Sequence, residues 1–384
     1  MHTFATVFLG LIGIGWIVQA FRALRGLSRI PRLAAVEPPA GTAGPRISVI
    51  FAARDEAEKL APALASMLAQ NYPDFEVIAV DDRSRDETPR ILDEFARKHS
   101  RLKVVHVHEL PEGWLGKPHA LQRGYEQATG EWLLFTDADV QFAPDLAGRA
   151  LALAQRDALD HLTLFARLDV SGFWETTGTV YFAVGFAFGV EPWRVPDPKS
   201  RRYMGAGYFQ LLRRSVYEAI GTHRRLAMEV VDDMKLGKLV KLGGFRSGVA
   251  VADSLVHLRW IRGVGELIRG VTKNSFAASG FSVTRTLIQI AGVLVVSVVP
   301  FAALLTTSGL AFLFAAIASA VAVAFLSVGA RRSGIPWLYG FTHPLGGLLF
   351  CYMLLRSMAV TLWRGGVVWR DTFYPLEQLK RGLV

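Results

Sequence analysis

The stretch Trp132-Leu133-Leu134-Phe135-Thr136-Asp137-Ala138-Asp139 has the length of a buried β-strand and ends in two carboxylates. Side chains alternate along an extended backbone, so we expect Asp137 and Asp139 to project to the same side. Two close carboxylates repel each other and favour a cation between them. Mg²⁺ or Mn²⁺ suits such oxygen ligands and leaves coordination positions for a diphosphate. The alternative is an acidic turn that caps the helix expected after Pro144.

Strands and helices alternate around this stretch. Apolar runs predict strands over residues 47–51, 75–80, 104–107 and 132–135. Helices are expected between them, ending near Gln70, spanning about Thr88 to His99, and spanning about His119 to Gln127. This alternation is typical of an α/β fold with a mostly parallel sheet and helices on both faces. In such sheets, ligands bind beyond the carboxyl ends of the strands.

Polar residues follow three of these strands. They are Arg54-Asp55 after the first strand, Asp81-Asp82 after the second, and Asp137 with Asp139 after the fourth. A carboxylate at such a strand end can accept hydrogen bonds from a base N–H or from ribose hydroxyls. We therefore interpret this edge as a nucleotide site. The alternative for Asp81-Asp82 is that they belong to the cap of the next helix.

A glycine-containing loop, Leu110–His119, leaves the same edge of the sheet. Gly113 and Gly116 flank Trp114, and glycine lets the backbone approach a ligand closely. Lys117 can neutralise a phosphate as a point charge. The alternative is a solvated turn in which Trp114 is a hydrophobic plug.

Composition predicts a membrane protein. The chain has 384 residues, of which 51% are hydrophobic, and its mean hydropathy is +0.29. The formal net charge is +10, but basic residues such as those at Arg22–Arg32 flank apolar spans. This placement favours anionic lipid headgroups, so the membrane and not nucleic acid is the expected partner. The single cysteine, Cys351, excludes a disulfide framework and a cysteine-rich metal site.

The domain organisation follows from these patterns. We expect an N-terminal transmembrane anchor (1–22), a basic linker (23–45), a cytoplasmic α/β domain (46–260), an amphipathic interfacial helix (261–284), two or three transmembrane helices (285–363) and a basic tail (364–384). Positive charge lies behind the first apolar segment, which favours a retained anchor over a cleaved signal peptide. Residues 336–362 either cross the membrane or re-enter near His343–Gly347, and only re-entry keeps the basic tail inside.

A second acidic pair, Asp232-Asp233, precedes apolar residues at helical spacing and so lies at a helix N-terminus, where the dipole stabilises carboxylates. Further on, Trp260 can stack on an acceptor and Arg259 can meet a diphosphate. The alternative for Arg259-Trp260 is a pair at the membrane interface.

Four of these stretches carry a family resemblance. Ile47–Glu56, Val80–Asp86, Gly113–Lys117 and Thr136–Asp139 resemble the family 2 glycosyltransferases of the GT-A fold, a Rossmann-like fold. The sequence looks most similar to bacterial membrane-anchored members associated with hopanoid and carotenoid biosynthesis. The resemblance covers about residues 46–258.

The resemblance implies roles for particular residues. Asp81 and Asp82 would lie in the nucleotide site, and Ala53, Arg54 and Asp55 would line the base and ribose. Asp137 and Asp139 would form the DxD element that holds the divalent ion and the sugar diphosphate. We expect Asp139 mainly to bind the metal and Asp137 to face the sugar and ribose; the alternative is that the two exchange these roles. Gly205 and Gly207 would line the sugar and acceptor pocket. The family has a Glu-Asp pair where this chain has Asp232-Asp233, so Asp233 is the expected base, with Asp232 or Glu229 in reserve.

The resulting expectation is a membrane-bound, metal-dependent, inverting glycosyltransferase at the inner cell membrane. It would move a sugar from a nucleotide-diphosphate sugar, a UDP-sugar by expectation, to a lipid-like hydroxyl acceptor. One alternative is a processive polysaccharide synthase, but Val256 stands where the Gln-x-x-Arg-Trp motif of such enzymes has glutamine. Another is a non-catalytic, membrane-anchored protein that binds nucleotide sugars.

Overall fold

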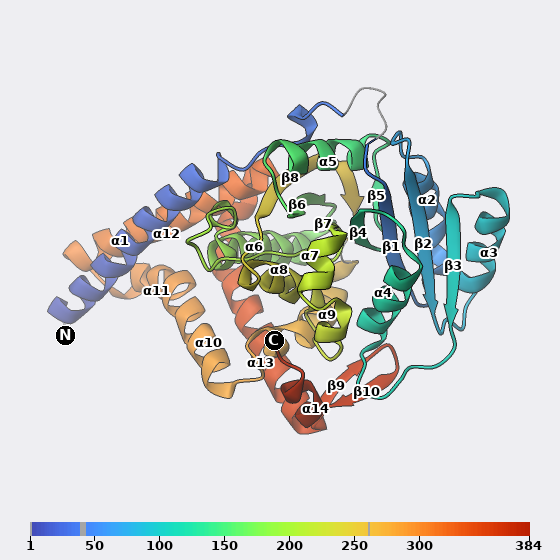
Figure 1. Ribbon diagram of the computed structural model, residues 1–384. Helices are drawn as coiled ribbons and strands as arrows, with labels where there is room; N and C mark the ends of the chain where they lie inside the picture. The colour runs from blue at the N-terminus through green and yellow to red at the C-terminus, as the bar shows by residue number, and fades with distance from the viewer. Residues whose placement is uncertain (1, 39–43, 260–261) are drawn as a thin grey trace. The chain divides into compact units, whose positions relative to one another are not determined.

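The computed structural model describes residues 2–38, 44–259 and 262–384 (Figure 1). The chain forms two compact units, each assembled from separate stretches. A helical unit comprises Met1–Arg29, Val170–Glu191 and Trp260–Trp369. A sheet unit comprises Ile30–Asp169, Pro192–Arg259 and Arg370–Val384.

The sheet unit contains an eight-stranded sheet in the order β3-β2-β1-β4-β7-β6-β8-β5. The strands are β1 (Ile47–Ala53), β2 (Phe75–Asp82), β3 (Leu102–Val107), β4 (Trp132–Asp137), β5 (Gln141–Phe142), β6 (His161–Leu168), β7 (Gln210–Arg213) and β8 (Ser247–Leu258). Strands β1 to β4 run parallel, as do β6 and β8, whereas β7 is antiparallel to β4 and β6, and β5 to β8. The predicted α/β class with a mostly parallel sheet is confirmed.

Helices cover the sheet, and their apolar faces form its core. They are α2 (Ala57–Leu68), α3 (Thr88–Lys98), α4 (Gly116–Gln127), α5 (Leu146–Arg156), α7 (Arg214–Ala219) and α8 (Asp232–Leu242). The unit also contains the short strand β10 (Thr372–Pro375) and helix α14 (Leu376–Arg381). Every residue of β2 is buried. Strands covered on both faces read as continuous apolar runs, which is why the sequence revealed them. One core cluster joins Ile50, Ile78 and Val80 of the strands to Leu121 of α4.

Strand order places the site. The chain runs from β1 outward through β2 and β3 and then returns to β4 on the other side of β1. Open α/β sheets bind ligands beyond the carboxyl ends of the strands where the order reverses, here between β1 and β4. The register pairs Ala53 with Asp81 and Ala52 with Asp137. The strand ends that carry the predicted nucleotide residues are therefore adjacent.

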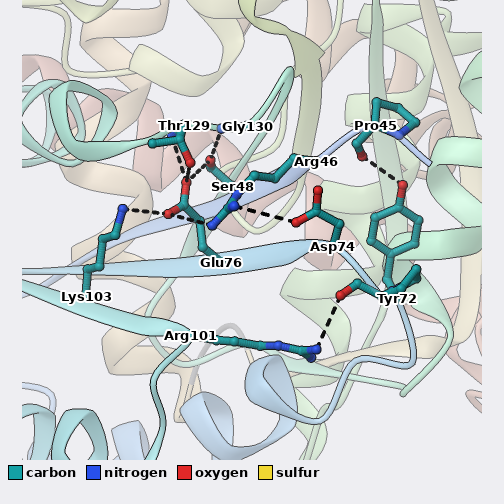
Figure 2. Close-up of polar contacts among 11 residues, drawn as sticks. Pro45, Arg46, Ser48, Tyr72, Asp74, Glu76, Arg101, Lys103, Thr129 and Gly130 are labelled. Atoms are coloured by element: carbon teal, nitrogen blue, oxygen red, sulfur yellow. Dashed lines mark hydrogen bonds and ion pairs between the residues drawn. The ribbon is translucent and has the colours of Figure 1, made fainter. Parts of the chain in front are cut away.

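At the opposite edge of the same strands, a buried carboxylate ties the sheet together (Figure 2). Glu76 accepts hydrogen bonds from Ser48 Oγ at 2.8 Å and from the Thr129 amide at 2.6 Å, and Lys103 Nζ lies 2.8 Å from it. Burial alone would raise the pKa of Glu76, but the hydrogen bonds from Lys103, Thr129 and Ser48 lower it to about 2. This network fixes the amino ends of β1, β2 and β3.

The helical unit consists of α1 (His2–Leu27), α6 (Phe173–Val190), α9 (Gly263–Ala278), α10 (Val283–Ser297), α11 (Val299–Thr306), α12 (Gly309–Arg332), the 3₁₀-helix η4 (Trp337–Thr342), α13 (His343–Arg364) and the strand β9 (Gly366–Trp369). Three helices of the described chain are long and apolar enough to cross a membrane: α1, α12 and the η4–α13 segment. A fourth candidate is the pair α10–α11, bent by 45°.

Two local features shape this unit. Helix α1 lies beside α12 (Figure 1), and alanines of α12, including Ala315 and Ala318, are buried in a cluster with Leu9 and Ile12 of α1. Small residues allow two helices to approach closely.

The α10–α11 bend occurs at Pro300, which has no N–H to donate to the carbonyl of Val296, four residues earlier. The indole of Trp16 donates to that carbonyl instead, at 2.9 Å.

Candidate active site

Lys117 and two carboxylates meet at the carboxyl edge of the sheet. Lys117 is in the first turn of α4, Asp137 is the last residue of β4, and Asp233 is in the first turn of α8. Lys117 Nζ donates to Asp137 Oδ1 at 2.5 Å. Burial alone would lower the pKa of Lys117, but Asp137, Asp232 and Asp233 together raise it above its ordinary value. Lys117 is therefore a permanent positive charge among acidic groups.

Two glycines make this arrangement possible. The Gly207 amide donates to Asp233 Oδ2 at 2.9 Å. A Cβ on Gly207 would lie 3.0 Å from Asp137 Oδ2 and 3.1 Å from Lys117 Nζ, in the space where the functional groups meet. A Cβ on Gly205 would overlap the carbonyl of Asp233, so glycine lets the first turn of α8 come close. Both glycines predicted to line the pocket thus contact Asp233.

The surroundings of Asp233 suit proton transfer. Asp233 Oδ1 accepts a hydrogen bond from the Met234 amide at 2.7 Å, as expected at a helix N-terminus. Burial is the main cause that raises the pKa of Asp233, and Asp137 adds to it, against Lys117 and the two amide donors. A carboxylate whose pKa is raised towards neutrality is a better general base. Asp232, its neighbour, is buried.

Asp139 differs from the expected position. The β1–β4 ladder ends at Asp137, so Asp139 lies in the turn that follows and not on the strand. Strand alternation therefore does not relate the two carboxylates. Lys59, in the first turn of α2, lies 3.1 Å from Asp139 Oδ2, so each aspartate of the pair has its own lysine. Among the described residues, no group of three or more His, Cys, Asp or Glu side chains is arranged to hold a metal ion.

Two strained loops, one after β1 and one after β2, form the edge where the sequence predicts the nucleotide site. We call these two loops the nucleotide rim. Asp55, after β1, and Arg83, after β2, both have positive φ, at 54° and 59°. Such non-glycine conformations cost about 1–3 kcal/mol and cluster at functional sites. The loops hold each other, because the Asp55 amide donates to Ser84 Oγ at 3.1 Å and Asp55 Oδ1 accepts from the Arg85 amide at 2.7 Å.

The carboxylates of Asp81 and Asp82 already have protein partners. Asp81 accepts from the Ser84 amide at 3.2 Å and contacts His106 Nδ1 at 3.1 Å. Burial would lower the pKa of His106, but Asp81 and Asp93 raise it. Asp82 pairs with Arg83 at 2.7 Å. Both aspartates therefore shape the rim, in addition to any contact they make with a ligand.

The other predicted residues are distributed as follows. Ala53 is buried as the last residue of β1, and the Nε of Arg54 is buried with no hydrogen-bond partner in the described structure. An unpartnered buried donor at a strand end is a candidate ligand contact. Arg259 follows β8 and is exposed, and Trp260 lies outside the described residues. Lys59 was not predicted, because nothing in the sequence links it to Asp139; its place in the first turn after a strand end was the one signal.

The sheet, its reversed strand order and this acidic edge are typical of the GT-A fold. Residues 48–221 match the family described as Glycosyl transferase family 2. The chain therefore contains a family 2 glycosyltransferase domain over these residues.

Curated relatives and solved structures agree with this assignment. The chain is 34% identical over 115 residues to the beta-monoglucosyldiacylglycerol synthase of Trichormus variabilis, covering 29% of this chain and 24% of that one. It is 35% identical over 99 residues to the poly-beta-1,6-N-acetyl-D-glucosamine synthase of Staphylococcus epidermidis, covering 26% and 23%. The chain thus matches only about a quarter of the length of these relatives.

A similar fold occurs in the mannosyltransferase PcManGT from Pyrobaculum calidifontis, solved in complex with GDP-Man and Mn²⁺. The TM-score is 0.54 at 22% identity, over 93% of this chain and 99% of that one. At this identity, the likeness concerns the fold.

Proposed function

We propose that this enzyme is a membrane-bound, metal-dependent, inverting glycosyltransferase that moves a sugar from a nucleotide-diphosphate sugar to the hydroxyl of a lipid-like acceptor. The observation that carries the proposal is the position of Asp233 beside the Lys117–Asp137 pair. A carboxylate of raised pKa next to a fixed positive charge supports the proposal, because glycosyl transfer to a hydroxyl needs a base and stabilisation of negative charge.

The donor would bind along the rim formed by Ala53, Arg54, Asp55, Asp81 and Asp82. The unpartnered Nε of Arg54 supports this placement, since it can donate to a base carbonyl or a phosphate. We expect a UDP-sugar. The similar PcManGT was solved with GDP-Man, so a GDP-sugar is the first competitor to test.

Mg²⁺ or Mn²⁺ fits the residues present. Asp137 and Asp139 supply hard oxygen ligands, and their side chains are 36% and 21% exposed, so an ion can reach them. Two carboxylates leave positions for diphosphate oxygens and water. When bound, the ion would offset charge on the leaving diphosphate. Lys59 and Lys117 hold the two carboxylates in place.

The chemistry of this chain's own residues is a single displacement. Asp233 takes the proton from the acceptor hydroxyl, whose oxygen forms a bond to the anomeric carbon. The bond from that carbon to the diphosphate oxygen breaks, and the diphosphate leaves with the electron pair. Lys117, next to Asp137, stabilises the negative charge of the leaving diphosphate. One displacement inverts the configuration at the anomeric carbon.

A lipid acceptor is supported by the three candidate membrane helices and by the similarity to a glucosyldiacylglycerol synthase. A processive polysaccharide synthase is the second candidate, favoured by the match to the N-acetylglucosamine polymer synthase. The two differ in product length, because a lipid glycosyltransferase adds a defined sugar and a synthase makes a ladder of products.

The sheet unit also bears on membrane topology. The chain leaves this unit after Arg259 and re-joins it at Arg370. If the unit is cytoplasmic, the number of crossings between these residues is even. Three candidates lie in between, namely α10–α11, α12 and η4–α13, so at least one of them does not cross.

Packing within the helical unit favours η4–α13 as the re-entrant element. A Cβ on Gly340 of η4 would overlap the Ser327 hydroxyl of α12, so the chain folds back along α12 at once. His343 is the first residue of α13, and the centroid of its ring lies 5.3 Å from the ring centroid of Trp16, which is midway along α1. Helix α13 would then begin within the bilayer, and α1, α10–α11 and α12 would cross it.

The test is transfer by the purified full chain in lipid nanodiscs. Radiolabelled UDP- and GDP-sugars are offered with a lipid extract, with Mn²⁺, Mg²⁺ or EDTA. We expect one labelled lipid product that depends on the metal. A ladder of products supports the synthase, and nucleotide-sugar binding without any transfer supports a non-catalytic binding protein.

A further inference from the structure

A segment at the far end of the sequence contacts the nucleotide rim. Residues Arg370–Val384 belong to the sheet unit. Arg370 Nη1 donates to the carbonyl oxygen of Arg54 at 2.7 Å, and Arg370 Nη2 is ion-paired with Glu56. Between these two contacts lies Asp55, the residue with positive φ. One guanidinium therefore holds the loop after β1 on both sides of its strained residue.

The rest of that loop is held from the other side. The amides of Asp55, Glu56 and Ala57 donate to the side chains of Ser84, Thr88 and Asp86, all in or near the loop after β2. These contacts satisfy donors, whereas Arg370 satisfies the carbonyl of Arg54. A charged donor on this carbonyl stabilises the turned peptide more than a neutral one would. The orientation of Arg54, with its unpartnered buried Nε, depends on that turn.

The same segment also contacts the loop after β2 and helix α8, which carries the proposed base Asp233. Tyr374 is buried and lies within hydrogen-bonding reach of the Arg83 guanidinium. The main-chain oxygen of Val384 accepts from Lys235 at 2.6 Å and from Lys238 at 2.7 Å. Both lysines are on α8, the helix that begins with Asp232-Asp233.

Charge connects Arg370 to the predicted metal ligands. Glu56 is close enough to Asp139 and Lys59 to interact with both. Burial raises the pKa of Glu56, Arg370 lowers it, and Asp139 raises it. Arg370 therefore partly offsets the negative charge of Glu56 near Asp139.

We infer that Arg370 is a positioning residue of the donor site, which holds the Arg54–Glu56 loop in the conformation that binds the nucleoside diphosphate. This inference rests on the proposed function, because it assigns a further residue to that donor site. Arg370 acts through Arg54 and Glu56 and does not itself need to touch the nucleotide.

The experiment uses the full chain with Arg370→Ala, Arg370→Lys and, as the matched control, Arg381→Ala, an exposed arginine of the same segment. Donor KM, acceptor KM, kcat and Tm are measured, with the Kd for UDP and GDP by calorimetry. We expect Arg370→Ala to raise the donor KM and the nucleotide Kd about tenfold. In Arg370→Ala the acceptor KM should stay as in the wild type, and the Tm should match that of Arg381→Ala. Arg370→Lys should restore part of the nucleotide affinity.

Two results would overturn the inference. One is an Arg370→Ala variant with the donor KM of the wild type. The other is a KM change that matches a loss of Tm and that lysine does not restore, which would mean a purely structural contact. Failure of the proposed function looks different, because the wild-type chain itself would then show no transfer with any donor.

Discussion

Lys117 Nζ and Asp137 Oδ1 lie 2.5 Å apart at the end of β4, so the acidic edge of this sheet contains its own positive charge. The pair is not isolated, since Asp233 also lowers the free energy of the lysine's charged form. The lysine in turn opposes the rise in the pKa of Asp233. Lys117 and Asp233 are therefore electrostatically coupled, so removing Lys117 changes the proton affinity of Asp233.

Lys117→Met tests this coupling through pH. Asp233 must be deprotonated to act as a base, so activity falls as pH falls through its raised pKa. Removing Lys117 takes away an interaction that lowers this pKa. We expect the acidic limb of the kcat profile to move to higher pH and kcat to fall about 10²-fold or more. The exposed Lys98→Met, at the end of α3, is the control, and an acidic limb that stays in place in Lys117→Met would contradict the coupling.

Gly207→Ala tests the space at the centre of the site. The new Cβ would lie about as close to Asp137 and Lys117 as a Cβ is ever found to other atoms. We expect transfer to fall by up to about 100-fold, the effect of a 1 Å misplacement of catalytic groups, because the neighbours must move by a few tenths of an ångström. Gly270→Ala, on α9 with nothing near its Cβ position, is the matched control and should retain activity. Equal activity of the two variants would show that the space is not part of the site.

Glu76→Gln tests the network at the opposite edge (Figure 2). Its lowered pKa means that the charged form stabilises the fold above the ordinary pKa of glutamate, and that this stabilisation is lost as pH falls towards about 2. At pH near 7 the substitution should cost about 2–4 kcal/mol of unfolding free energy. The difference from the wild type should shrink between about pH 5 and pH 2. Chemical denaturation checks this, with the exposed Glu131→Gln as control, and a pH-independent difference would contradict it.

Cysteine labelling tests the proposed topology. In a Cys351→Ser background, Ser308→Cys should react with an impermeant maleimide in spheroplasts, because it joins α11 to α12 on the outer side. Ser333→Cys and Arg381→Cys should react only after the membrane is opened. Labelling of Arg381→Cys from outside would mean that η4–α13 crosses, and the sheet unit could then not hold both Arg259 and Arg370 in the cytoplasm.

Much of the fold and part of the site could be predicted from the sequence. The strands were predictable because β1, β2 and β4 are buried on both faces and read as apolar runs ending in polar residues. The helix N-terminus at Asp232 was predictable from apolar periodicity. The turn position of Asp139 was not, because it depends on where pairing with β1 stops. Nor were Lys59–Asp139 and Arg370–Glu56, because contacts between residues far apart in sequence arise only once the sheet forms.

The most direct test of the central claim is the rate of sugar transfer by Asp233→Asn. Asparagine preserves the shape of the side chain but cannot accept the proton. We expect transfer from a labelled nucleotide sugar to fall about 10²- to 10⁴-fold, with nucleotide Kd and Tm close to those of the wild type. The exposed Asp169→Asn is the control. Transfer by Asp233→Asn at the rate of this control would contradict the assignment of Asp233 as the base and, with it, the proposed mechanism.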